Sequence, residues 1–335
     1  MFEQIEKAVN ELQAGQDLIR EELDISSVEA LIILFSQMLE QSDDEFDALA
    51  DQVQSDVEQA IKRADFKVLN GADQRQVLQF LLVGTMLKDH LPANYQITPD
   101  AIGMWVGYFV EQFVGKKAQV KLADFGIGSG NLLATVQQVM TNEHVEATGF
   151  ENDDTMLTLA SGVIALLKRD WKLELEDVIA VDSSAEFDLV LGDLPVGYYP
   201  AQVPDDFKTS VEEPNELTFV HHLLAEKALK VLKPGGQALL LVPANLFESE
   251  QAPKLLAWLQ TDEVLFQAFI QFPGKMFADQ SSQKALLILQ KPGENVKQAE
   301  PVLLAKVPEL TNKTENQAFI AEFSRWIAEN QMISE

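Results

Sequence analysis

Asp193, Leu194 and Pro195 form a segment suited to bind an amino group. The apolar run from Phe187 to Leu191 predicts a buried strand, so this segment follows the carboxyl end of that strand. A residue before proline is restricted to extended backbone, which lets the Asp193 carboxylate and the Leu194 carbonyl converge on one donor. Two such acceptors orient an amine and stabilise positive charge that develops on it. A loop that only turns the chain is the alternative.

A glycine-rich stretch between Asp124 and Gly130 forms a second candidate site, with Gly126 and Gly128 inside it. It falls where an expected strand ends and a helix begins at Asn131. The backbone can therefore turn tightly and approach a ligand whose anionic part meets the helix N-terminus. The G-x-G-x-G spacing differs from the G-x-G-x-x-G of dinucleotide sites. Nicotinamide, flavin and S-adenosylmethionine cofactors, and a structural turn, all stay open on this stretch alone.

Glu151 directly follows another expected strand, Val145 to Phe150. Its carboxylate would lie at the carboxyl edge of the sheet, where it can accept hydrogen bonds from the ribose hydroxyls of an adenosine. This position favours a nucleotide-containing cofactor.

Metal and thiol chemistry are not expected from the composition. The chain has no cysteine and four histidines, which removes disulfides and thiolate metal sites. His221 and His222 fall inside an expected helix, Phe219 to Leu232, without a third ligand at useful spacing. We expect both imidazoles to pack rather than to bind a metal ion.

Charge and hydropathy limit the partners. The formal net charge of -28 opposes binding to a polyanion such as DNA, because lysine and arginine supply most of that affinity. The first residues lack a basic region, and no apolar run is long enough to cross a bilayer. We expect a soluble cytoplasmic protein with no membrane partner.

The elements that position these residues alternate between strand and helix after about residue 93. Strands are predicted at 120–125, 145–150, 173–180, 187–191 and 237–243, with helices from 131, at 153–169, at 216–232 and up to 260. This order predicts a doubly wound α/β sheet of parallel strands. The last two strands, 264–271 and 285–290, are too close for a crossover helix, so we expect them to pair antiparallel, one lying between existing strands.

The division into two domains follows from the same patterns. Residues 1–92 show helical periodicity with many acidic residues and no convincing strand, which predicts an acidic, all-helical domain. Residues 93–335 form the second domain. Thr98 offers an N-cap and Pro99 a first helical residue, so a helix is expected to run from there to about Val114.

The sequence resembles the class I S-adenosylmethionine-dependent methyltransferases. Within them it resembles the N6-adenine-specific DNA methylases related to the modification subunits of type I restriction systems. The likeness covers roughly residues 97–292. It rests on ordered motifs at Ile97-Thr98-Pro99, Asp124 to Gly130, Glu151, Asp193 to Tyr199, Lys233-Pro234-Gly235-Gly236 and Phe272 to Phe277. The resemblance implies a Rossmann-like, seven-stranded methyltransferase sheet with an antiparallel final strand.

The same resemblance implies that the cofactor is S-adenosyl-L-methionine. It places Thr98, Asp124 and the three loop glycines at the methionine part, Glu151 at the ribose, and Asn152 with Asp177 at the adenine ring. Pro99 and Asn131 complete the expected cofactor-binding residues.

The reactive motif departs from the family pattern, which is Asn, Asp or Ser, two prolines and an aromatic that stacks the flipped base. Leu194 replaces the first proline and Val196 the aromatic. The lost ring could contribute about 1 to 3 kcal/mol per base. Tyr198 or Tyr199 could supply another ring, and we expect Pro195 and Tyr198 to shape the pocket. Without an obvious target-recognition domain or basic stripe, DNA would be contacted weakly or through a partner subunit.

The leading hypothesis is therefore a methyltransferase acting on an amino nitrogen, of the N6-adenine DNA type, with Asp193, Leu194, Pro195 and Tyr198 as catalytic residues. One alternative is a protein or small-molecule acceptor. Another is an S-adenosylmethionine-binding regulatory or scaffold protein with little turnover. A dinucleotide oxidoreductase is the last alternative.

Overall fold

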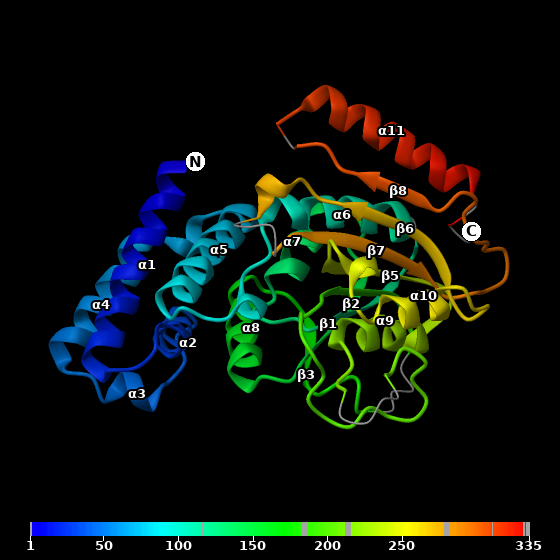
Figure 1. Ribbon diagram of the computed structural model, residues 1–335. Helices are drawn as coiled ribbons and strands as arrows, with labels where there is room; N and C mark the ends of the chain where they lie inside the picture. The colour runs from blue at the N-terminus through cyan, green and yellow to red at the C-terminus, as the bar shows by residue number, and fades with distance from the viewer. Residues whose placement is uncertain are drawn as a thin grey trace. The chain divides into compact units, whose positions relative to one another are not determined.

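The computed structural model describes residues 2–115, 117–181, 186–211, 216–277, 282–309, 311–330 and 332. The chain divides into two compact units. The helical unit comprises Met1–Ile97, Ile127–Ala134 and Glu151–Leu175, and the sheet unit comprises Thr98–Gly126, Thr135–Phe150 and Glu176–Glu335. Figure 1 labels their elements.

The helical unit begins with a run of helices that contains no strand among its described residues, as the sequence predicts. They are α1 (Phe2–Leu23), α2 (Ser27–Met38), α3 (Asp44–Asp47), α4 (Asp51–Ala64), η1 (Phe66–Val68), α5 (Gly71–Lys88) and η2 (Ala93–Tyr95). Helix α8 (Asp154–Leu166) and strand β3 (Trp171–Leu175) belong to the same unit. Helix α2 starts with a capping box in which Ser26 and Glu29 satisfy each other's backbone N–H groups.

The core of the helical unit joins α8 to the N-terminal helices. Met156, Leu159 and Val163 of α8 are buried in one cluster with apolar residues of α1, α2, α4 and α5. Gly162 allows the closest approach, because a Cβ there would lie 2.7 Å from Cδ2 of Phe35 on α2. The packing of α8 thus ties the start of its own helix, after Glu151, to the N-terminal helices.

The sheet unit holds seven strands in the order β2-β1-β4-β5-β7-β6-β8. Their bounds are β1 (Val120–Phe125), β2 (Val145–Glu151), β4 (Phe187–Asp193), β5 (Leu232–Pro243), β6 (Leu265–Gln271), β7 (Lys284–Gln290) and β8 (Leu303–Lys306). Strands β2, β1, β4 and β5 run parallel. Strand β7 lies between β5 and β6 and is antiparallel to both (Figure 1). The predicted antiparallel pair, with one strand inserted between existing ones, is confirmed.

Helices cover the two faces of this sheet, as a doubly wound fold requires. They are α6 (Asp100–Val114), α7 (Asn131–Val139), α9 (Val220–Val231), α10 (Ala252–Leu259) and α11 (Lys313–Glu329), with the short η3 (Leu246–Glu248) and η4 (Gly274–Met276). Leu240 of β5 is buried in a cluster with α9 and α10, while the alternate residues Leu239 and Leu241 are also fully buried. Helix α6 packs against α11 through Phe109 and Phe323, whose ring centroids lie 4.8 Å apart.

Several predicted boundaries are wrong. Strand β3 ends at Leu175, so Asp177 lies in the loop after it rather than within a strand over 173–180. The expected turn at 233–236 is part of β5, which accommodates it through a register irregularity and Gly235 at φ 80°. Strand β8 was not predicted. Pro99 is the N-cap of α6, and Thr98 does not cap that helix.

Candidate active site

Asp193 is the last residue of β4, and both of its carboxylate oxygens have partners. The Thr98 hydroxyl donates to Oδ2 at 2.6 Å, and the Lys284 ammonium forms an ion pair with Oδ1. The side chains of Asp193 and Lys284 are 17% and 24% exposed, so the pair is shielded but reachable. The carboxylate at the predicted amine-binding corner is thus held in a fixed orientation.

The sequence did not predict Lys284 as a partner of Asp193. It is the first residue of β7, and the antiparallel register places it opposite Pro243 of β5. The only sequence signal is a single cation before the buried apolar run of β7. A single cation at this position does not indicate contact with Asp193, because that contact depends on the register of β7 against β5.

Leu194 follows Asp193 and stands where the family motif has a proline. Its contacts account for this difference. Its backbone N–H donates to the carbonyl oxygen of Leu241 on β5 at 3.0 Å, a bond that proline cannot make. Its side chain is fully buried in the core with α9 and α10. Gly192 precedes Asp193. No side chain fits at position 192, since a Cβ there would lie 2.7 Å from the Phe125 carbonyl oxygen. The corner is anchored by packing and by a backbone bond.

The two tyrosines after the corner lie in different environments. Tyr199 is buried, and its hydroxyl donates to Oδ2 of Asp177 at 2.7 Å. Burial and this carboxylate raise the pKa of Tyr199. Tyr198 is 48% exposed and stacks on Phe219, with ring centroids 4.8 Å apart and an interplanar angle of 15°. Its hydroxyl donates to Glu250 at 2.8 Å. Of the two rings, that of Tyr198 is therefore the one accessible to solvent.

His221 and His222 lie in α9, stacked against Phe219 or edge-on to it. Both are buried, and burial lowers the pKa of His221 to about 3 and that of His222 to about 4. The charge of Lys284 contributes to the low pKa of His221, which also hydrogen-bonds the Pro195 backbone. Both imidazoles are neutral at pH 7, and His221 contacts the corner at Pro195.

The glycine-rich loop continues from β1 with three glycines in the left-handed region. Gly126, Gly128 and Gly130 have φ values of 74°, 53° and 79°, which a residue with a Cβ rarely adopts. In the sheet unit, the Gly126 N–H donates to the Phe150 carbonyl oxygen at 3.0 Å, joining the ends of β1 and β2. A Cβ on Gly126 would lie 3.9 Å from Cδ of Pro195, so the loop starts beside the predicted amine-binding corner.

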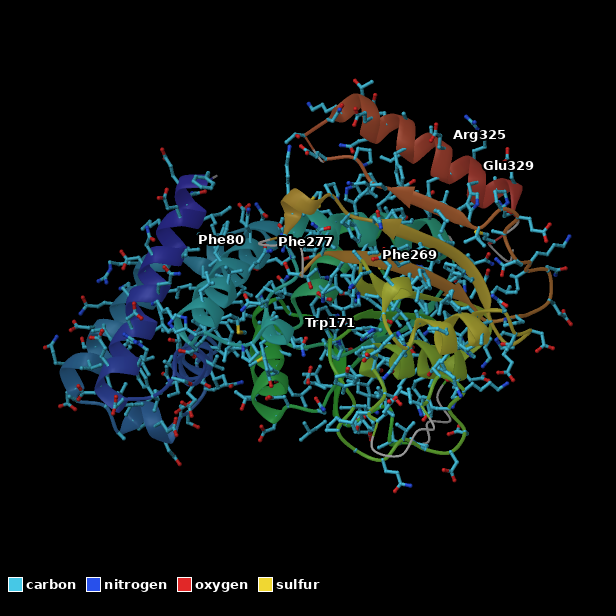
Figure 2. All side chains as sticks on the ribbon, in the orientation of Figure 1. Phe80, Trp171, Phe269, Phe277, Arg325 and Glu329 are labelled. Atoms are coloured by element: carbon cyan, nitrogen blue, oxygen red, sulfur yellow. The ribbon has the colours of Figure 1, made fainter. Side chains whose placement is uncertain are left out.

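In the helical unit, Glu151 is held by the backbone. Its Oε2 accepts from the Gly128 N–H at 2.9 Å, and its Oε1 accepts from the N–H groups of Asn152 and Asp153 at 2.9 and 3.1 Å. A carboxylate offers about four acceptor positions, so one remains on Oε2 for a ligand hydroxyl. Trp171, labelled in Figure 2, is buried on β3 and would lie 3.4 Å from a Cβ at Gly130.

These groups suit S-adenosylmethionine by the chemistry of their donors and acceptors. Nothing lies within 4 Å of a Cβ position at Gly128, so the backbone there is open to a ligand. The fixed Glu151 carboxylate can accept from a ribose hydroxyl. Asp177 keeps acceptor capacity for an adenine amino group although its Oδ1 already accepts from the Ile179 N–H at 3.0 Å. Asp124 and Asn131 are buried at the two ends of the loop.

The structure thus brings some of the predicted site residues together in each unit. The sheet unit joins Thr98 to Asp193, while the helical unit joins Gly128 to Glu151. Thr98, expected at the methionine part of the cofactor, gives its hydroxyl to Asp193. Among the described residues, no cluster of three or more carboxylates or imidazoles is arranged to hold a metal ion. No helix in the same part of the chain is long and apolar enough to cross a membrane.

Known proteins match this chain over most of its length. The family model described as N-6 DNA Methylase matches residues 98–327. YtxK, an uncharacterized protein of Bacillus subtilis (strain 168), is 33% identical over 310 residues, covering 92% of this chain and 93% of YtxK.

Solved structures of other proteins share the fold of this chain. A Listeria monocytogenes protein assigned to the class I S-adenosylmethionine-dependent methyltransferases superposes with a TM-score of 0.85 at 28% identity, covering 97% of this chain and 99% of its own. The methyltransferase subunit of a type I restriction-modification system from Streptococcus thermophilus shares the fold, with a TM-score of 0.64 at 15% identity over 96% of this chain and 78% of the subunit. The family and the fold imply use of S-adenosylmethionine, and this chain belongs to the N-6 DNA methylase family of S-adenosylmethionine-dependent methyltransferases.

Proposed function

We propose that this protein methylates the N6 amino group of adenine in DNA, with Asp193 and the Leu194 carbonyl as the groups that orient the amine. The observation that carries the proposal is the fixed Asp193 carboxylate at the end of β4, beside the start of the glycine-rich loop. S-adenosylmethionine, when bound, supplies an activated methyl group. The chain's own residues supply position and charge.

Asp193 has the larger part in this chemistry. An amino group conjugated to a ring is a poor nucleophile, because its lone pair is delocalised into the ring. Accepting one of its N–H groups at Asp193 favours a more tetrahedral nitrogen and stabilises the positive charge that develops there. Thr98 holds the carboxylate in place for that contact, and fixed geometry contributes to rate by itself.

The cofactor roles are part of the same proposal. Glu151 would accept from a ribose hydroxyl, and Asn152 with Asp177 would face the adenine ring. Asp124 and the three glycines would lie at the methionine part with Pro99 and Asn131 nearby. The buried position of Asp124 and the backbone clamp on Glu151 support these assignments.

Contact with DNA would be weak or would come through a partner subunit. The net charge of -28 opposes binding to the phosphates of DNA. The Streptococcus thermophilus protein of the same fold is itself a subunit of a larger system. The location would be the cytoplasm.

A protein or small-molecule acceptor is the second candidate, favoured by Val196, which is 46% exposed where the family has a stacking aromatic. Incubation of the full chain with tritiated S-adenosylmethionine and separate DNA, RNA and protein fractions decides between them. We expect label in DNA as N6-methyladenine, lost in Asp193→Ala, with Asp205→Ala, at a residue outside the corner, as the control. Label in the protein fraction instead would refute the DNA acceptor. Cofactor binding without label in any fraction would favour a regulatory protein.

A further inference from the structure

Lys284 places a positive charge at the one carboxylate that would receive the substrate. The ion pair with Oδ1 of Asp193 and the 2.6 Å hydrogen bond from Thr98 to Oδ2 leave one acceptor position free on each oxygen. Lys284 offsets part of the negative charge of Asp193, so the carboxylate can stabilise the partial charge that develops on a neutral amine but does not attract a full cation. His221, which contacts Pro195, and the adjacent His222 are neutral at pH 7, so they do not change this balance.

Two kinds of amine meet this corner differently. A neutral amino group on a ring needs one acceptor position and can donate an N–H to Asp193 while Lys284 stays in place. An alkylammonium group must either displace Lys284, which exchanges one cation for another, or lie within a few ångströms of a like charge. At such distances like charges repel strongly where water is partly excluded.

The carboxylates further out do not reverse this preference. Glu250 is bound to the Tyr198 hydroxyl at 2.8 Å, and Glu216 lies near the same ring. These groups can attract cations to the surface of the protein. They do not supply a second anion at Asp193 itself.

We propose that Lys284 is a specificity-determining residue, which restricts the Asp193 corner to the neutral amino group of a nucleobase and excludes the alkylammonium groups of lysine side chains and polyamines. This inference rests on the proposed function and names what sets its substrate class. Lys284 acts by charge, so arginine should replace it and methionine should not.

The test measures binding rather than turnover. The full chain is saturated with S-adenosylhomocysteine, and the affinities of deoxyadenosine and of Nα-acetyl-lysine amide are measured by NMR titration. Wild type should bind deoxyadenosine at least about tenfold more tightly, which corresponds to about 1.4 kcal/mol. Lys284→Met should shift the ratio of the two affinities toward the lysine probe by about tenfold. Lys284→Arg should keep the wild-type ratio.

Lys233→Met is the matched control. Lys233 forms an ion pair with Asp188 at 2.9 Å, near the opposite end of β4, and its removal should leave the ratio unchanged. An unchanged ratio in Lys284→Met overturns the inference, and so does wild-type preference for the lysine probe. Failure to bind deoxyadenosine in the presence of bound S-adenosylhomocysteine also overturns it. The proposed function fails separately, when deoxyadenosine binds with the expected selectivity but DNA receives no methyl group.

Discussion

The backbone N–H of Leu194 donates to the carbonyl oxygen of Leu241 at 3.0 Å and so ties the segment that follows Asp193 to β5. Proteins with the two-proline motif of the family cannot form this bond, because a proline at position 194 has no N–H to donate. The fully buried Leu194 side chain adds a second anchor.

Leu194→Pro, which restores the family residue, should therefore destabilise this protein. The Leu241 carbonyl would lose its partner in a buried strand, at a cost of about 1 to 3 kcal/mol. Chemical denaturation of the two proteins gives the difference in free energy of unfolding. Val196→Phe, the other reversion, changes a half-exposed side chain and should leave stability unchanged. Equal stability of Leu194→Pro and wild type would show that the bond is dispensable.

Thr98→Val tests whether Thr98 serves Asp193. The change removes the hydroxyl that donates to Oδ2 at 2.6 Å and keeps the shape of the side chain. A hydrogen bond to a charged group contributes about 1.5 to 3 kcal/mol, so we expect methyl transfer to slow by about tenfold or more. Affinity for S-adenosylmethionine, measured by calorimetry, should be retained. A parallel loss of cofactor affinity would instead place Thr98 at the methionine part, as the family resemblance implies.

The buried imidazoles predict a fall in stability on mild acidification. The pKa values of His221 and His222 are lowered to about 3 and about 4, so the unfolded chain takes up protons below pH 6.5 while the folded chain does not. Between pH 6.5 and its pKa in the folded protein, each histidine lowers the free energy of unfolding by about 1.4 kcal/mol for every pH unit of acidification. Above pH 6.5 these two histidines do not lower the free energy of unfolding. Below pH 6.5 they lower it increasingly as the pH falls.

His222→Leu should reduce that dependence, since the imidazole is fully buried and leucine has a similar volume. The gain relative to wild type should be about 2 kcal/mol larger at pH 5 than at pH 8. Denaturation midpoints at the two pH values measure it, and the exposed His144→Gln serves as control. The same pH dependence in wild type and His222→Leu would contradict the argument.

Much of the fold could be predicted from hydrophobic patterns. The bounds of β1 and the antiparallel insertion of β7 followed from apolar runs and from the short connection between the last two predicted strands. The same signal failed after β3, because Val178 and Ile179 are apolar yet lie buried in a turn. Strand β8 has only four residues and lies between Pro301 and Pro308, which is too short for an alternating pattern to be recognised.

The site was predicted only in part for a related reason. Asp193 and Glu151 could be placed because each lies just after the carboxyl end of a predicted strand. The partners of Asp193 lie 95 residues before it and 91 residues after it, at Thr98 and Lys284. Their positions depend on where α6 starts and on the register of β7 against β5, which local sequence does not determine. The sequence therefore indicated the role of Asp193 but not the residues that bind its carboxylate.

The last prediction is that the ring of Tyr198 replaces the missing stacking residue. It is 48% exposed, supported from behind by Phe219 and restrained by the hydrogen bond to Glu250. A base that stacks on such a preorganised ring gains about 1 to 3 kcal/mol. Tyr198→Ala should therefore weaken deoxyadenosine binding by about tenfold or more.

Tyr198→Phe keeps the ring and its stack on Phe219 and loses only the bond to Glu250, so it should bind deoxyadenosine within about threefold of wild type, less than 1 kcal/mol. Thermal unfolding should be similar in all three proteins, because the ring is half-exposed. The comparison assigns any loss in Tyr198→Ala to the ring rather than to the hydroxyl. Wild-type affinity in Tyr198→Ala would show that the base does not stack there, and an equal loss in both variants would place the contact at the hydroxyl.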